Sequence, residues 1–284
     1  MSIVVVGAGG QLGQELCQLI PRSKLVALTH QDIELTDGPG FMSVLGPLSP
    51  SVVLNAAAFN HVDQAEDRPA DAFGTNAFGV RELAKVCREL DATLVQYSSD
   101  YVFGLDQNRD QSYDETAVPG PLGVYGLSKL AGEYFVRSIC SRYFVIRTCG
   151  VYGMKGAGGK GRNFVLTMLR LARENRQIRV VNDQTCTPTC AADLARATLQ
   201  LLTTNEYGLY HWTNSGSCTW FQFAGEIFRQ TGLHVDCTEI TSQVFAARAK
   251  RPGYSVLSTD KFQRLGFAMP RPWQDAVGEF LQQA

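Results

Sequence analysis

The segment Ile3-Val4-Val5-Val6-Gly7-Ala8-Gly9-Gly10-Gln11-Leu12-Gly13 decides the fold of this chain. An apolar, β-branched run passes directly into glycines spaced three apart, in the pattern Gly-x-x-Gly-x-x-Gly. Such glycines permit a tight turn, close approach of the backbone to a pyrophosphate, and close packing of the next helix on the strand. The start of that helix offers free N–H groups and a positive dipole end to phosphates. The segment therefore predicts a dinucleotide-binding turn, with a purely structural turn as the alternative. The residues expected at the cofactor are Gly7, Gly10, Gln11, Leu12 and Gly13.

Short apolar runs alternate with amphipathic stretches through the first half of the chain. We expect strands at residues 2–6, 24–28, 52–55, 93–97 and 143–147, and helices at 10–19, around 74–90 and at 128–138. Near-continuous apolar strands joined by helices favour an α/β fold, a Rossmann doubly wound parallel sheet covered on both faces. In such sheets ligands bind at the carboxyl ends of the strands.

The pattern changes after Arg147. Residues 150–161 contain six glycines and predict a mobile loop. Helices follow at 164–174, 191–202, 220–230 and 273–282, with strands at 178–181 and 208–212. We expect a dinucleotide-binding domain of residues 1–149, to which 178–203 return, and a smaller mixed substrate-binding lobe of 150–177 and 204–284.

The composition is that of an ordinary globular protein. Of 284 residues 45% are hydrophobic and 19% charged, and the net charge is −1. Without a polybasic run, the sequence favours neither a nucleic-acid nor a membrane partner. No basic leader, cleavage site or apolar run of spanning length is visible, so we expect a cytoplasmic protein. Its eight cysteines lack a Cys-x-x-Cys pair, which favours reduced thiols over a zinc site.

Three side chains downstream of the turn form a candidate catalytic set. Tyr125 and Lys129 stand four residues apart, on one face of a predicted helix. A nearby cation favours the phenolate, and acid–base chemistry at a carbonyl needs such a group. Ser99 follows the 93–97 strand, at the edge of the sheet where chemistry is expected. We expect Ser99 to hydrogen-bond a carbonyl, Tyr125 to donate a proton as hydride arrives, and Lys129 to lower the pKa of Tyr125 and hold the nicotinamide ribose. An incidental tyrosine–lysine pair on a surface helix is the alternative.

These motifs together resemble the extended short-chain dehydrogenase/reductases, and among them the family of dTDP-4-dehydrorhamnose reductases. The resemblance runs nearly end to end and includes Asn55-Ala56-Ala57-Ala58, residues 97–103, residues 124–133 and Arg251-Pro252-Gly253-Tyr254-Ser255. It implies reduction of the 4-keto group of a nucleotide sugar, dTDP-4-dehydro-L-rhamnose, usually by NADPH. The second strand is followed by neither a carboxylate at its end nor an arginine, so NADH remains an alternative cofactor. A homodimer is compatible with the resemblance.

The resemblance also assigns roles to further residues. It places Glu34 and Leu35 at the adenosine side of the cofactor, and Ala56, Ala57 and Ala58 at its middle. At the substrate we expect Ser99, Asp100, Gly150, Asn163 and Arg251. Arg251 is interpreted as a clamp for the diphosphate or, alternatively, as a solvated surface residue. Asn163 is interpreted as a phosphate ligand or as the N-cap of the helix that follows it.

Two departures from the family pattern stand out. The family commonly has Arg-Thr-Ser-Trp-Val-Tyr, with the tryptophan against the sugar, where this chain has Gly150. The loss of an indole enlarges the pocket and removes stacking area. Some members bind Mg²⁺ through three glutamates; Glu15 matches one, but the second position is Ala192 and the third a C-terminal glutamine. We therefore expect no metal.

The sequence is compatible with two other functions. One is a reductase or epimerase of the same fold that acts on another nucleotide 4-keto sugar, which the glycine at 150 favours. The other is a non-catalytic subunit similar to the regulatory subunit of methionine adenosyltransferase. The intact set of Ser99, Tyr125 and Lys129 argues against the latter, because a binding module needs no tuned acid.

Overall fold

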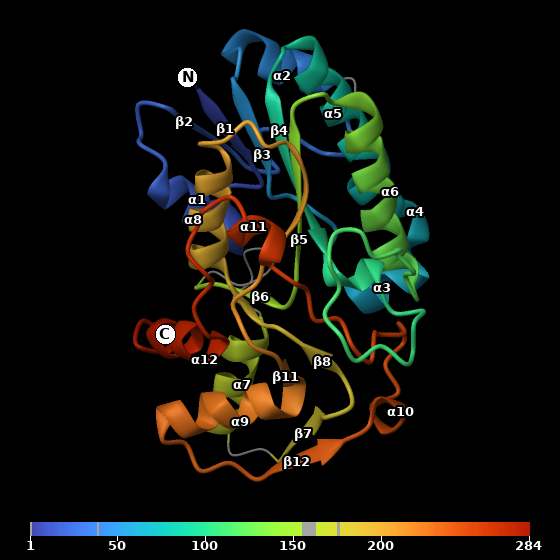
Figure 1. Cartoon of the computed structure of the whole chain (residues 1–284), viewed down its shortest axis with the longest axis vertical. Coiled ribbons are helices and arrows are strands. Elements are labelled where there is room, and N and C mark those ends of the chain that lie inside the picture. The colour runs from blue at the N-terminus through green and yellow to red at the C-terminus, as the bar shows by residue number, and fades with distance from the viewer. Residues whose placement is uncertain (1, 39, 155–162, 175–176) are drawn as a thin grey trace.

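A six-stranded parallel sheet organises the chain (Figure 1). The computed structural model describes residues 2–38, 40–154, 163–174 and 177–284. The strands lie in the order β2-β1-β3-β4-β5-β10. They are β1 (Ile3–Val6), β2 (Leu25–Leu28), β3 (Val52–Asn55), β4 (Thr93–Ser99), β5 (Tyr143–Thr148) and β10 (Gly208–His211). The doubly wound parallel sheet is confirmed, and each of these strands lies within two residues of its expected bounds.

Helices cover both faces of this sheet, as the alternation of buried side chains requires. Ile3 and Val5 face the core formed with α1 (Gln11–Leu19) and α8 (Ala191–Leu201). Val4 and Val6 face the core formed with α2 (Gly40–Leu48), α5 (Val80–Glu89) and α6 (Val124–Ile139). All four of these strand side chains are nearly inaccessible to solvent, which explains why the strand is apolar on both faces.

Helix α6 begins at Val124, four residues before the expected start. The reason is a tertiary contact: the Val124 N–H donates to Glu66 Oε1 at 2.8 Å, from α3 (Val62–Asp67). An N–H in the first turn of a helix has no partner within the helix, and here a distant carboxylate supplies one. The local sequence does not predict this contact with Glu66. Because the contact extends the helix to Val124, Tyr125 lies in the first turn of α6.

A smaller lobe lies below the sheet in the view of Figure 1. Its core joins α7 (Phe164–Arg173), α9 (Trp220–Thr231) and α12 (Trp273–Leu281) with β7 (Ile178–Val181). The helices and strands expected in the second half of the chain are present, and their ends differ from the expected ones by one residue at most. The expected glycine-rich loop lies outside the described residues from 155 onward.

Two strands pair within a different domain from the one expected for their segment of the chain. Strand β7 lies in the segment that we expect to return to the large sheet, residues 178–203, but it pairs with β12 (Cys237–Ile240) in the lobe. Its Arg179 is exposed between buried neighbours, which suits a sheet covered on one face only. Conversely, β10 lies in the range expected for the lobe, residues 204–284, yet it pairs with β5 at the edge of the large sheet. Leu209 and Tyr210 are both buried there, one on each face.

Short elements that the sequence analysis did not predict complete the structure. They are α4 (Pro69–Phe73), the π-helix η1 (Gly74–Gly79), the 3-10 helix η2 (Asp100–Val102), α10 (Ser242–Phe245), α11 (Asp260–Gln263) and the strand pairs β6 (Val151–Tyr152) with β9 (Thr189–Cys190) and β8 (Thr185–Cys186) with β11 (Cys218–Thr219). Within the described ranges, none of the helices is both long and apolar enough to cross a bilayer.

Candidate active site

The glycine-rich turn lies where the strand order reverses, between the ends of β1 and β3. Gly7 has φ +80°, and a Cβ on it would lie 2.7 Å from the backbone N of Ala57. A Cβ on Gly13 would lie 2.2 Å from the carbonyl oxygen of Gly7. Neither position has room for a side chain, because the turn, the segment after β3 and helix α1 are in contact. Gly9, by contrast, has open space where its Cβ would be.

Helix α1 starts without a side-chain cap. Its N-cap is Gly10, and its first turn carries no acidic residue. The free N–H groups and the positive dipole end are therefore available to an anion such as a pyrophosphate. Gln11 Nε2 donates to the carbonyl of Val151 at 2.8 Å, while the buried Gln11 Oε1 has no partner among the described residues. An acceptor of this kind fits a hydroxyl of a cofactor ribose.

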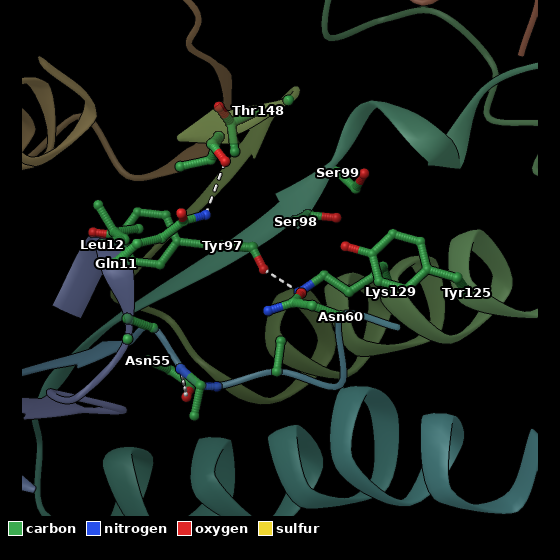
Figure 2. A pocket seen from close by; sticks show the side chains of 16 residues that line it. Gln11, Leu12, Asn55, Asn60, Tyr97, Ser98, Ser99, Tyr125, Lys129 and Thr148 are labelled. Carbon is green, nitrogen blue, oxygen red and sulfur yellow. Dashed lines mark hydrogen bonds between the residues drawn. The ribbon is translucent and has the colours of Figure 1, made fainter. Parts of the chain in front are cut away.

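A cleft with a volume of about 270 Å³ opens at this edge of the sheet. It brings together ten of the predicted residues: Gly10, Gln11, Leu12, Ala56, Ala57, Ala58, Ser99, Tyr125, Lys129 and Gly150. It also includes residues that the sequence analysis did not select: Asn55, Asn60, Tyr97, Ser98, Thr148 and Val151. Figure 2 shows Ser99, Tyr125 and Lys129 on one side of the cleft, with Gln11 and Leu12 across from them. Ser98 precedes the last residue of β4, and Thr148 ends the neighbouring parallel strand β5. Their position at adjacent strand ends was the available signal for them.

Close packing of two short segments sets the position of Tyr125. A Cβ on the next residue, Gly126, would lie 2.1 Å from the carbonyl oxygen of Tyr101 in η2. The Tyr101 and Tyr125 rings meet edge to face, with centroids 5.8 Å apart. Ser99 precedes η2 and accepts a hydrogen bond from the Tyr101 N–H at 3.1 Å. One glycine contact thus places the phenol of α6 beside the hydroxyl at the end of β4.

Burial shifts the pKa values of the catalytic pair. It raises the pKa of the Tyr125 phenol above its usual value, and the Asp100 carboxylate adds to this, while a hydrogen bond with Ser99 opposes it. The net shift of the Tyr125 pKa is therefore upward, because burial outweighs the groups that favour the phenolate. Burial also lowers the pKa of Lys129 to about 8, against the opposing effect of Glu133. Both shifts have one cause, since desolvation disfavours the charged form of each group. The Lys129 ammonium donates to the carbonyl of Tyr97 at 2.6 Å.

A buried ion pair lies beneath Lys129. Glu133 follows Lys129 by one helical turn and is inaccessible to solvent. Its two carboxylate oxygens accept from Arg147 Nε at 2.9 Å and from Arg147 Nη2 at 2.7 Å. Ser98 Oγ donates to the same carboxylate at 2.5 Å. Burial and the neighbouring Arg147 lower the pKa of His211 to about 3, so His211 is neutral here. This network joins α6 to β4 and β5 directly below the candidate catalytic residues.

Asn76 holds the segment that follows β3, and sequence reasoning missed it. Its Oδ1 accepts from the Phe59 N–H at 2.9 Å, and its Nδ2 donates to the Phe59 carbonyl and to Ser128 Oγ, both at 3.0 Å. This single side chain, from η1, connects the Ala56–Ala58 side of the cleft to α6. An asparagine in a stretch of helical pattern gives no local signal of such a contact.

Three of the residues expected at the cofactor or the substrate lie away from the lining of the cleft. Glu34 is exposed, and Leu35 is a core residue that is only 3% exposed. Asp100 is buried and accepts from Ser99 Oγ at 3.0 Å and from Ser255 Oγ at 2.7 Å. Asp100 therefore contacts the back of Ser99 and not the open space of the cleft.

The remaining two assigned residues have protein partners. Asn163 Oδ1 accepts from the Leu166 N–H at 2.9 Å, and its Nδ2 donates to the Gly153 carbonyl at 2.7 Å. This confirms the helix-cap interpretation of Asn163. Arg251 pairs with Asp63 at 2.7 Å.

No metal-binding group emerges from the part of the chain that the structure describes. There, no set of three or more His, Cys, Asp or Glu side chains is placed to hold an ion. Glu15, the one residue that the resemblance matches to a metal ligand, is half-buried on α1, and Arg196 partly offsets the rise in its pKa that burial causes.

Comparison with known proteins shows the family to which this chain belongs. The family model described as RmlD substrate binding domain matches residues 1–284. The chain belongs to this family. It is 36% identical to dTDP-4-dehydrorhamnose reductase of Escherichia coli (strain K12), covering 100% of this chain and 98% of that protein. It is 37% identical to the spore coat polysaccharide biosynthesis protein SpsK of Bacillus subtilis (strain 168), covering 99% and 97%.

Solved structures of relatives agree with the fold. The crystal structure of dTDP-4-dehydrorhamnose reductase from Bacillus anthracis in complex with NADP superposes with a TM-score of 0.94, at 35% identity and full coverage of both chains. Thermus thermophilus UDP-glucose 4-epimerase, at 17% identity, has a TM-score of 0.82 and shows the likeness of fold alone. The family also includes a relative with another name, dTDP-4-keto-6-deoxy-D-glucose reductase of Streptomyces niveus, which is 34% identical and covered to 94%.

Proposed function

We propose that this protein reduces the 4-keto group of dTDP-4-dehydro-L-rhamnose to dTDP-L-rhamnose with NADPH. The observation that carries the proposal is the convergence of Ser99, Tyr125 and Lys129 in one cleft with the glycine-rich turn. Reductases with this name are 33–39% identical over nearly the whole chain, and one relative was crystallised with NADP. Membership of the family supports the substrate class, and the cleft supports the chemistry.

The residues of the glycine-rich turn, where the strand order reverses, fit a dinucleotide cofactor. NADPH, when bound, supplies the hydride. The uncapped start of α1 would hold its pyrophosphate, and Gln11 Oε1 would accept from a ribose hydroxyl. Lys129 would reach the nicotinamide ribose from the opposite side of the cleft. After the end of β2, the carboxylate of Asp32 accepts hydrogen bonds from the N–H and from the hydroxyl of Thr29, both at 2.8 Å.

The proton step follows from the ionisation of the catalytic residues. Because burial raises the pKa of Tyr125, this residue is protonated at neutral pH and ready to donate. As the substrate carbonyl becomes an alkoxide, Tyr125 gives its proton to that oxygen, and the Ser99 hydroxyl stabilises the developing charge. Lys129, positively charged at neutral pH, then stabilises the phenolate that remains.

The test is NADPH oxidation, followed at 340 nm, with dTDP-4-dehydro-L-rhamnose as substrate. Tyr125→Phe removes the proton donor and keeps the ring, so turnover should fall by about 10²–10⁴-fold. Circular dichroism and NADPH binding should remain as in the wild type. Full activity of this variant would exclude Tyr125 as the donor. Absence of turnover in the wild type, with retained nucleotide binding, would favour a non-catalytic subunit.

A second candidate is the same reduction on a different dTDP-4-keto-6-deoxy sugar. Gly150 at the cleft and the relative named dTDP-4-keto-6-deoxy-D-glucose reductase favour it. A panel of dTDP-4-keto sugars separates the two candidates by kcat/KM. An epimerase would interconvert sugars without consuming NADPH, so the same panel identifies it.

A further inference from the structure

The place that a side chain at position 150 would take is filled from another part of the chain. Gly150 lies two residues after the end of β5 and has φ +52°, a conformation that favours glycine. A Cβ on it would lie 3.1 Å from Cη2 of Trp220 and 3.5 Å from the Cα of Pro188. Trp220 is the first residue of α9 in the lobe. The six-membered ring of its indole therefore lies beside Gly150, which is one of the residues that line the cleft.

Several interactions fix the position of this indole. Thr219 caps α9 in a reciprocal box with Gln222: the Gln222 N–H donates to Thr219 Oγ1 at 3.1 Å, and the Thr219 N–H donates to Gln222 Oε1 at 2.9 Å. The ring centroid of Phe164 lies 4.8 Å from that of Trp220, and Phe164 stacks on Phe223 at 5.4 Å. The start of α9 is thus held both by its backbone and by an aromatic cluster, so the indole is a preformed wall.

The opposite side of Trp220 lines a second pocket, of about 320 Å³. Tyr101, Phe245, Arg179 and Arg251 also line it. Tyr101 connects it to the catalytic cleft, because its ring contacts the ring of Tyr125. Phe245 is 51% exposed. The two arginines offer positive charge for a diphosphate beside an aromatic surface that is open to a ligand.

We propose that Trp220 determines which sugar the cleft accepts, by forming the aromatic wall against which the sugar ring packs. This inference rests on the proposed function, because it takes a nucleotide sugar as the ligand. A pyranose has an apolar C–H face that packs against an aromatic ring, and an indole offers the largest such surface. With glycine at 150, the wall comes from α9 of the lobe and not from the end of β5.

Fluorescence tests this contact without turnover. The probe is the product, dTDP-L-rhamnose, titrated into wild-type protein. Trp212 and Trp273 are each 5% exposed in separate cores, whereas Trp220 is partly exposed, lines the second pocket and lies beside Gly150. We expect saturable quenching in the wild type and in the control Trp212→Phe, and its loss in Trp220→Phe. Quenching that persists in Trp220→Phe would overturn the proposal.

Kinetics then separates contact with the sugar from a merely structural role. Trp220→Ala should raise KM for the nucleotide sugar by about tenfold, with KM for NADPH unchanged, and Trp220→Phe should recover most of the loss. An unchanged KM for the sugar, or an equal rise of both KM values, would contradict the proposal. If Trp220→Ala does not fold, Trp220→Phe and the titration still decide. If the wild type shows quenching but no turnover, the proposed reduction fails while the role of Trp220 in binding stands.

Discussion

The ionisation of Lys129 predicts how activity depends on pH. Its pKa is lowered from 10.5 to about 8 by burial, and Glu133, one turn away, opposes the shift. Tyr125 keeps its proton through this range, because burial raises its pKa. Between pH 7 and 9 Lys129 is therefore the catalytic group that changes charge. We expect kcat/KM for reduction to fall as it does so.

The size of the effect follows from the titration curve. With a pKa of about 8, about nine-tenths of Lys129 is charged at pH 7 and about one-tenth at pH 9. If only the charged form supports turnover, kcat/KM falls about tenfold over these two pH units. An unperturbed lysine would leave the rate almost constant, since its pKa of 10.5 lies above the whole window.

The assay is the initial rate of NADPH oxidation in a constant-ionic-strength buffer series from pH 6.5 to about 10. Lys129→Arg is the matched variant, because an arginine stays protonated throughout. Its absolute rate should be lower, since the guanidinium has a different shape, but the decline centred near pH 8 should vanish. A wild-type rate that stays flat to pH 10, or the same decline in Lys129→Arg, would refute the assignment.

Unfolding does not explain such a decline. The pKa of Lys129 is lower in the folded protein than in the unfolded chain, so between about pH 8 and 10.5 the unfolded chain binds more protons. The contribution of this group to the free energy of unfolding therefore increases with pH across that window. Circular dichroism along the same buffer series should show a folded protein where the rate has already dropped.

Two further predictions address the turn and the buried ion pair. Gly13→Ala places a methyl group 2.2 Å from the Gly7 oxygen, so it should weaken NADPH binding about tenfold or more in a fluorescence titration. The control Gly9→Ala has open space around its methyl group and should bind NADPH as the wild type does. Equal affinities for the two variants would show that the tight turn does not matter for the cofactor. Arg147→Met leaves the carboxylate of Glu133 buried without its cation and should lower the free energy of unfolding by about 3–5 kcal/mol in urea. Adding Glu133→Leu should restore most of that loss, and a further loss in the double variant would contradict this reasoning.

Local patterns predicted the elements better than the partners of those elements. The segment from Ile3 to Val6 is a strand because it is apolar on both faces, and that property is visible in the sequence. Strand β7 also has its expected bounds, yet its partner is β12, a pairing between segments far apart in the chain. Sequence periodicity reports which faces of an element are buried but not which element covers them.

The candidate site divides in the same way. The spacing of Tyr125 and Lys129 and the position of Ser99 after β4 sufficed to predict that the three meet in one cleft. The contribution of Asn76 had no such signal, because its hydrogen bonds to Phe59 and Ser128 connect segments that only the folded chain brings together.

The sequence by itself determined the dinucleotide turn, the parallel sheet and the identity of the three candidate catalytic residues, because each depends on spacing within one element or on adjacency of strand ends. Only the tertiary structure decided how Tyr125 and Lys129 ionise and what stands beside Gly150. Desolvation of a side chain depends on every element that covers it, so the pKa of Tyr125 is raised where the spacing alone predicted a lower one. The surface beside Gly150 belongs to Trp220, whose helix reaches the cleft only through the packing of the lobe.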